Sequence, residues 1–241
     1  MALKNIPDPG FSDDDGTADP RLTAALAAWS QERAAEPMVL EALKDARLLV
    51  PVVAILGEAE TGEDGLRREK SSDMAVPTLQ AGDRRALPAF TSTASLARWD
   101  PQARPVAVPL HQALQAAAHE RADTLVLDLA GPVPYELKGA ALLALAEGRT
   151  STDPLDDPAV VEAVRDVVAA HPDVLRAHLG PGNADGTLAL VLAPGADRSA
   201  ATDIAAGLAA HEVLRARLVR GLDLALLPAA APAPNTPLFA R

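Results

Sequence analysis

Cysteine is absent from this chain of 241 residues, and aromatic residues make up only 2% of it. Without cysteine there are no disulfides, no thiolate metal ligands and no cysteine nucleophile. Because aromatic rings are so few, the core must be built from Ala, Leu and Val, and stacking platforms for single-stranded nucleic acid are disfavoured. The lack of thiols is typical of a reducing compartment, and we expect a cytoplasmic protein.

Basic residues are also scarce. Lys and Arg number 22 against 33 Asp and Glu, so the formal net charge is −11. An acidic surface repels nucleic acid phosphates and anionic lipid, and neither is an expected partner. No apolar run approaches the roughly 18 residues of a membrane span. Residues 1–20 lack the charged-then-apolar pattern of a signal peptide. We therefore expect a soluble, intracellular protein without a membrane anchor.

Hydrophobic residues nevertheless make up 49% of the chain, enough for a sizeable core. Their arrangement in short runs predicts an α+β fold with two small mixed α/β domains, each with helices packed on a mainly mixed sheet. A polar segment at 149–156 marks the boundary between them. The predicted parts are a disordered acidic tail (1–18), a first domain (19–150), a second domain (155–228) and a mobile Ala/Pro-rich tail (229–241).

Apolar runs bounded by Gly and Pro predict strands, and apolar residues at 3.6-residue spacing predict helices. Pro51 indicates an edge position or a bulge in its strand. In the first domain we expect helices beginning at 20 and near 37, a loop at 57–72, helices at 93–99, 110–121 and 136–147, and strands at 48–56, 74–80, 86–91, 106–108 and 124–129, with a hairpin turn at 81–85. In the second we expect helices around 160–168 and at 199–217, and strands at 174–179, 187–192 and 222–227.

Polar side chains follow two of these strands. Thr91 and Ser92 end one strand, Asp128 ends another before a Gly-Pro turn, and Tyr135 follows that turn. Ligand sites often form where a strand ends and a helix begins, so these four residues are the candidate ligand-binding set. The alternative is structural: Thr91 or Ser92 caps a helix, Asp128 bonds backbone N–H groups at the turn, and Tyr135 closes the core.

No catalytic residue, metal site or cofactor is predicted. The hydroxyls lack a G-x-S-x-G context. His111 and His119, eight residues apart on one helix, would point about 80° apart and lie roughly 12 Å apart. The glycines at 57–62 precede Glu63 rather than the lysine of a phosphate loop, and those at 180–186 precede a strand rather than the helix of a dinucleotide site.

Three arginines cluster near the end of the last predicted helix: Arg215, Arg217 and Arg220. We interpret them as a solvated helix end whose charge complements the helix dipole. The alternative is a docking site for an acidic partner or for the protein's own tail.

Several stretches resemble the N-terminal domain of SseB-like proteins, named for enhanced serine sensitivity. They are 48–53, 86–92 after a Gly-Asp turn, Leu96 with Trp99, and 126–132, and the resemblance covers about residues 37–147. Residues 178–180 and 222–227 are similar to the companion C-terminal domain, and the Ala-rich composition is similar to that of actinobacterial members. The resemblance implies a cytoplasmic protein of two small mixed α/β domains, and it implies no catalytic residues.

The sequence is compatible with two functions. The first is a non-enzymatic binding or regulatory protein that uses its strand edges and Pro-rich ends to bind a protein partner or to self-associate, with a homodimer as one outcome. The second is a small-molecule-binding protein or minor enzyme with a polar site near Thr91, Ser92 and Asp128. Whether the protein is an enzyme is left open, although the sequence favours the first function.

Overall fold

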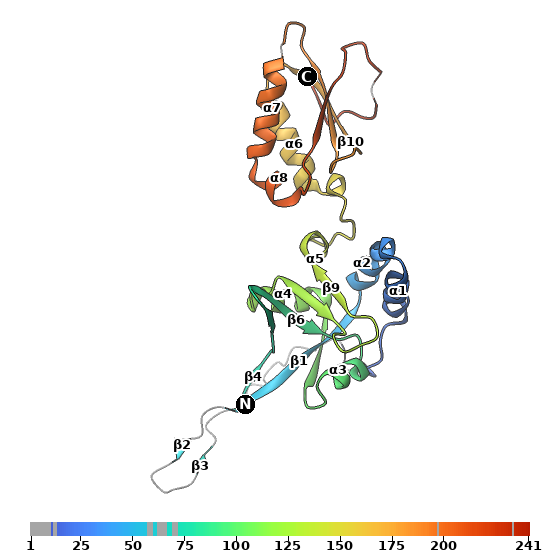
Figure 1. The fold of residues 1–241 in the computed structure, drawn as a ribbon, viewed down its shortest axis with the longest axis vertical. Helices are drawn as coiled ribbons and strands as arrows, with labels where there is room; N and C mark the ends of the chain where they lie inside the picture. Colours follow the sequence, from blue (N-terminus) through green and yellow to red (C-terminus); the bar gives the residue numbers. More distant parts are fainter. Residues whose placement is uncertain are drawn as a thin grey trace, which may run out of the picture. The chain divides into compact units, whose positions relative to one another are not determined.

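The computed structural model describes residues 11, 14–56, 60–61, 67–68, 72–196, 198–232 and 234–241. The chain divides into two compact units, with the division between Thr150 and Ser151 (Figure 1). Both units pack helices against sheets of mixed strand direction, which confirms the predicted α+β class.

Unit 1 contains two principal sheets that meet at one residue pair. The strand orders are β4-β1-β7 and β5-β6-β8-β9, and Leu49 of β1 exchanges two backbone hydrogen bonds of 2.8 Å with Phe90, which follows β6. Strands β6 and β8 run parallel. The elements are α1 (Pro20–Gln31), η1 (Arg33–Ala35), α2 (Glu36–Lys44), β1 (Arg47–Leu56), β2 (Glu60–Thr61), β3 (Arg67–Arg68), β4 (Ser72–Ala75), β5 (Leu79–Ala81), β6 (Arg84–Ala89), α3 (Thr93–Trp99), β7 (Arg104–Pro109), α4 (Leu110–His119), β8 (Thr124–Leu127), β9 (Tyr135–Lys138) and α5 (Gly139–Ala146).

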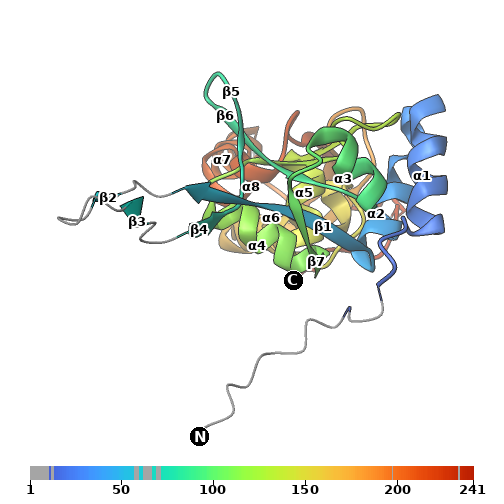
Figure 2. The same cartoon turned by 90° about the horizontal axis from the view of Figure 1, so that it is seen from below.

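Local sequence explains where the helices of unit 1 begin. The Asp19 carboxylate accepts a hydrogen bond of 2.7 Å from the N–H of Arg21, and Pro20 occupies the first turn of α1. Helices α1 and α2 lie side by side (Figures 1 and 2). Their apolar faces join α4, α5 and the sheets in one large core, while Phe90, Leu49 and Leu96 form a smaller core beneath α3.

Three prolines of β1 and β7 lie at positions where the pairing of these strands uses no N–H group. Leu49 directs its backbone groups toward Phe90, so its pairing with Ala107 of β7 is of the non-hydrogen-bonded type. The same holds two residues away in either direction, where Pro51 faces Pro105 and Arg47 faces Pro109. No N–H is needed at these positions, so the prolines cost the β1–β7 ladder nothing. The pairing of β1 with β4 begins only at Val53, so Pro51 has no β4 residue opposite it. This agrees with the edge position predicted for Pro51.

Some boundaries in unit 1 differ from prediction. The segment predicted as a helix over 136–147 begins as a strand, because Tyr135 and Leu137 are buried while Glu136 and Lys138 are exposed. The expected strand at 74–80 is interrupted at 76–78. Of the expected loop at 57–72, most residues lie outside the described residues, and Glu60–Thr61 pairs with Arg67–Arg68.

The predicted disordered tail also needs correction at its end, because residues 14–18 contact the folded unit. Asp14 forms a salt bridge of 2.6 Å with Arg47, and the carbonyl of Gly16 accepts a hydrogen bond of 2.9 Å from the N–H of Thr93. Arg47 also donates to the carbonyl of Thr17 at 2.6 Å. We call residues 14–18 the N-terminal strap. Most of the tail before it lies outside the described residues.

Unit 2 is a four-stranded sheet in the order β12-β11-β10-β13, with its helices on one face (Figure 1). Val160, Val164 and Val168, in the helix predicted around 160–168, are fully buried against β10 and β11. The elements are η2 (Pro154–Asp156), α6 (Pro158–Ala170), β10 (Val174–Gly180), β11 (Thr187–Leu192), α7 (Arg198–Ala210), α8 (Glu212–Arg217), β12 (Asp223–Leu226) and β13 (Phe239–Ala240).

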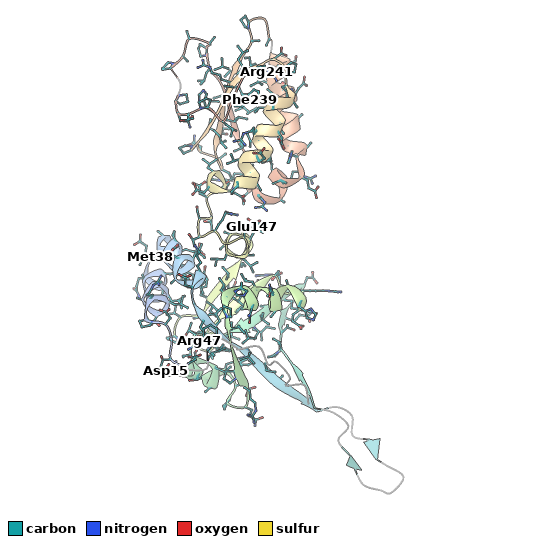
Figure 3. The ribbon with its side chains drawn as sticks, turned by 180° about the vertical axis from the view of Figure 1, so that it is seen from behind. Asp15, Met38, Arg47, Glu147, Phe239 and Arg241 are labelled. Atoms are coloured by element: carbon teal, nitrogen blue, oxygen red, sulfur yellow. The ribbon has the colours of Figure 1, made fainter. Side chains whose placement is uncertain are left out.

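Two expectations for unit 2 are corrected. The single helix predicted over 199–217 is broken at His211, whose backbone is extended (φ −70°, ψ 123°). The Ala/Pro-rich tail, predicted to be mobile, returns to the sheet as β13 and pairs with β10. Asn235 anchors this tail with its side chain. Its Nδ2 donates to the carbonyl of Leu179 at 2.8 Å, and its Oδ1 lies 3.1 Å from Nδ1 of His178. Phe239 and Arg241 lie close together at the end of this segment (Figure 3).

Candidate functional site

The ends of the parallel strands β6 and β8 are joined by one pair of side chains. Both oxygens of the Asp128 carboxylate accept hydrogen bonds from Thr91: Oδ1 from the backbone N–H at 2.9 Å, and Oδ2 from the hydroxyl at 2.6 Å. Both residues are buried, at 8% and 6% exposure. The carboxylate therefore bonds the neighbouring strand end rather than the turn that follows it.

The backbone of Asp128 is equally engaged. Its N–H donates to the carbonyl of Ala89 at 3.0 Å, and its carbonyl accepts from the N–H of Gly131 at 2.7 Å. Its φ of 48° lies in the left-handed region, which Asp and Asn enter more readily than most residues. Asp128 thus ends β8, continues the pairing to β6 and begins the turn to β9.

Ser92 caps α3, as one of the two sequence interpretations proposed. Its hydroxyl accepts from the N–H of Ser95 at 3.1 Å, and the hydroxyl of Ser95 lies 3.2 Å from the N–H of Ser92, which completes a capping box. Phe90, immediately before this pair of strand-end hydroxyls, is fully buried. The Phe-Thr-Ser step therefore fixes where the strand stops and where the helix starts.

Thr91, Ser92 and Asp128 nevertheless line one pocket, which we call the strand-end pocket. Its volume is about 270 Å³, and α1, α3 and the turn after β8 form its walls. Arg98 of α3 is exposed at this pocket, and its guanidinium makes no hydrogen bond or ion pair with any described residue. The residues lining the pocket are Ala18, Thr23, Leu26, Ala27, Thr91, Ser92, Ser95, Arg98, Asp128, Pro132 and Val133.

Tyr135, the fourth candidate, does not line this pocket. Its ring is 1% exposed and meets the edge of Trp29 at a centroid distance of 4.9 Å. Its hydroxyl donates to Oε1 of Glu36 at 3.0 Å. Burial of the phenol raises the pKa of Tyr135 far above its usual range, and the Glu36 carboxylate raises it further. The structure thus favours its alternative interpretation, in which Tyr135 closes the core.

Arg47 and Arg98 are the residues at this site that the sequence did not indicate. Arg47 donates to the carbonyl of Thr91 at 2.9 Å and also holds the N-terminal strap, so it ties the strap to the strand end. Arg47 and Asp15 of the strap lie close together in Figure 3. The hydroxyl and the N–H of Thr17 bond the Asp15 carboxylate and lower the pKa of Asp15. An arginine at the start of a strand carries no sequence signal for these contacts.

A metal-binding cluster and a membrane-spanning helix are both absent from the part of the chain that the structure describes. The described residues contain no group of three or more His, Cys, Asp or Glu side chains placed to hold a metal ion. Among the helices in this part of the chain, none combines the length and the apolar character needed to span a bilayer.

Comparison with known proteins gives one family. Residues 22–144 match the sequence model of the SseB protein N-terminal domain. This range contains Thr91, Ser92, Asp128 and Tyr135 and extends from α1 into α5. No curated protein and no solved structure matches the chain.

Proposed function

This chain belongs to the SseB family, and on that premise we propose that it is a non-enzymatic binding or regulatory protein of the cytoplasm. The observation that supports this most is the pairing of Thr91 with Asp128, in which each side chain is the other's structural partner. A catalytic hydroxyl must face substrate beside a base that is oriented by a third group. The Thr91 hydroxyl borders the strand-end pocket but donates to Asp128, and the Asp128 carboxylate is held in turn by the N–H of Thr91.

The proposed ligand is a protein, and the surface that best fits it is a groove between α1 and α2. Met38 lies at this groove with 56% of its surface exposed, and Pro37 adjoins it. The groove has a volume of about 530 Å³ and is mainly apolar, with Arg21 and Glu41 at its border. Exposed apolar surface bordered by charge is typical of protein interfaces. The partner that binds this groove is either another protein or a second copy of this chain. As a separate point, we propose that unit 2 is the C-terminal domain that accompanies the SseB N-terminal domain.

The edge of β7 is a weaker candidate than the sequence suggested. The backbone groups of Pro105, Ala107 and Pro109 face away from β1, as the pairing of Leu49 with Phe90 requires. Of these three residues only Ala107 can donate a hydrogen bond to an added strand. Proline on an open edge blocks strand addition, so self-association through β7 is disfavoured.

Site-specific photo-crosslinking tests this proposal. A photoreactive phenylalanine analogue replaces Met38 in one variant and the exposed Gln102, in the turn before β7, in a matched control. We expect a discrete crosslinked protein species from position 38 in cells that produce the chain at its native level, and none from position 102. Equal yields at both positions, or no adduct at position 38, would contradict the proposal.

A second function is favoured by the free arginine at the strand-end pocket. Thr91, Ser92 and Asp128 meet there beside Arg98, a cation that no described residue neutralises. A small anion is the ligand that such a pocket would take. Titration of the ¹⁵N-labelled protein with acetate or inorganic phosphate should shift the amide signals of Ser92 and Arg98. Arg98→Gln should abolish the shifts, and Arg104→Gln on β7 should leave them intact. Unchanged binding by Arg98→Gln would exclude this function.

A further inference from the structure

We infer that unit 2 binds a small monocarboxylate with an apolar chain, in a cavity between α7, α8 and β12. We call it the α7–α8 cavity. It is a different site from the strand-end pocket and does not depend on the function proposed above. Its volume is about 270 Å³, and its lining residues are Ala205, Leu208, Ala209, Leu214, Arg215, Leu218, Arg220, Gly221, Leu222 and Leu224.

The cavity wall is apolar because α7 presents alanines where larger side chains would fill the space. Ala205 and Ala209 lie one turn apart on α7, and Leu208 between them belongs to the core of unit 2. Leu214 of α8 is 2% exposed and joins the same core. A cavity with such walls binds an apolar group rather than a polar one, since it offers water few hydrogen-bond partners.

Two arginines line the cavity, and one of them, Arg215, brings an uncompensated charge to it. Arg215 is exposed, and its guanidinium makes no hydrogen bond or ion pair with any residue that the structure describes. Arg220 forms a salt bridge of 3.4 Å with Asp185 and directs its Nη atoms to the carbonyls of Asn183 and Ala184, at 2.8 and 2.9 Å, so its charge is already compensated. All other lining residues are Ala, Leu or Gly, so the lining contains no acidic side chain. Because Asp185 compensates Arg220, the Arg215 guanidinium is the free cation at this cavity among the described residues, in a chain of net charge −11.

Asp185 holds the arginine-bearing loop in place. Its buried carboxylate accepts hydrogen bonds from the N–H groups of Val219 and Arg220 at 2.6 Å and of Gly221 at 3.1 Å. A loop fixed at three consecutive amides loses little freedom when a ligand binds beside it, which favours affinity. Val219, in the middle of this loop, is 91% exposed and adds an apolar side chain near two lining residues.

The volume and the charge together define the ligand class. One water-sized group occupies about 30 Å³, so the cavity has room for roughly nine such groups. The planar fork of an arginine matches a carboxylate, and an apolar chain of six to eight carbons, on the order of the remaining volume, would fill the Ala- and Leu-lined part. A medium-chain carboxylate meets both requirements.

Titration of the full-length ¹⁵N-labelled protein with octanoate tests the inference. We expect saturable shifts of the amide signals of Arg215, Gly221 and Leu222, and none in unit 1. Octylamine, which carries the opposite charge, should not bind, and octanol should bind at least about tenfold more weakly because it lacks the charge that Arg215 would pair.

Two variants locate the site, and both change residues at the cavity rather than in the buried core. Arg215→Gln should weaken octanoate at least about tenfold, and Ala205→Leu should fill the cavity and reduce binding further. Arg104→Gln in unit 1 is the matched control and should bind octanoate normally. The inference is overturned if octanoate shifts none of these signals, if Arg215→Gln binds as the native protein does, or if a peptide with an apolar C-terminal residue binds the cavity while octanoate does not.

Discussion

Thr91 donates both its backbone N–H and its hydroxyl to the carboxylate of Asp128, a residue 37 positions later in the chain. The two hydrogen bonds join the ends of adjacent parallel strands at the position where α/β proteins often place a ligand. Here the same atoms that would meet a ligand hold the strand ends together. The strand-end pocket beside them therefore has a rigid wall, which suits binding better than it suits chemistry at Thr91.

The buried phenol of Tyr135 should titrate only when the protein unfolds. It is the only tyrosine in the chain, so tyrosinate absorbance reports this residue alone. Because burial raises its folded-state pKa, the stability it contributes is fully present below the unfolded value of about 10 and is lost as pH rises above that value. In an alkaline titration, tyrosinate absorbance should rise together with the loss of circular dichroism. Ionisation near pH 10 in a folded chain would contradict the buried position.

Gly16 and Gly82 form a matched pair for testing the N-terminal strap. Both have positive φ, 78° and 61°, so alanine is strained at either position and should cost about 1 kcal/mol. At Gly16 a Cβ would also lie 2.6 Å from Cγ2 of Thr93, whereas at Gly82 it would meet nothing within 4 Å.

Gly16→Ala should therefore displace the strap and speed hydrogen exchange at the N–H of Thr93, which bonds the Gly16 carbonyl. Gly82→Ala should lower the free energy of unfolding without changing exchange at that amide. Equal exchange rates at Thr93 in the two variants would show that the strap does not rest on the folded unit.

Asp185 should make the stability of unit 2 depend on pH in the acid range. Burial opposes ionisation of its carboxyl, but hydrogen bonds from the N–H groups of Arg220, Val219 and Gly221 outweigh it and lower the pKa of Asp185. The stability is therefore present above the unfolded-state pKa of about 3.9 and is lost as pH falls below it.

Urea unfolding of Asp185→Asn measures this contribution. At neutral pH we expect unit 2 to lose about 1–2 kcal/mol, since the amide cannot accept all the hydrogen bonds that the carboxylate does. Near pH 3 the difference from the native protein should shrink. Asp223→Asn, at the exposed first residue of β12, is the control and should show no such convergence. A constant difference across pH would contradict the assigned role.

The prolines of β7 should keep its edge from pairing. Pro105→Thr combined with Pro109→Thr restores two outward N–H groups, and the variant should self-associate in sedimentation velocity at concentrations where the native chain does not increase in size. Pro181→Thr, in the hairpin loop of unit 2, is the control and should not change sedimentation. An unchanged double variant would mean that something other than proline protects this edge.

The sequence predicted the parts of the fold that depend on neighbouring residues. Apolar spacing located α6, a capping hydroxyl was expected from Thr91 or Ser92 before α3, and the strand ends bearing Thr91 and Asp128 were assigned to one candidate site. The break at His211 was missed because the apolar spacing continues through it. Tyr135–Lys138 was missed because an alternation of four residues adjoins a longer helical pattern.

The other differences arise from contacts between residues far apart in the sequence. Asp14 meets Arg47 across 33 positions, and Asn235 meets His178 across 57. Composition classifies both terminal segments as solvated, since acidic or Ala/Pro-rich stretches rarely fold alone. The described part of each segment contacts a partner on the domain surface, and no pattern within the segment identifies that partner.

A double-mutant cycle on Thr91 and Asp128 tests most directly whether this pair is structural, on which the proposal of a binding protein depends. Thr91→Val removes the hydroxyl, Asp128→Ala removes the carboxylate, and the backbone cost of alanine at φ 48° cancels in the cycle. We predict from urea unfolding that Asp128→Ala destabilises unit 1 and that the two changes are coupled by about 1–3 kcal/mol. Additive effects, or an Asp128→Ala protein as stable as the native one, would contradict the account and direct attention back to a catalytic or ligand-binding carboxylate.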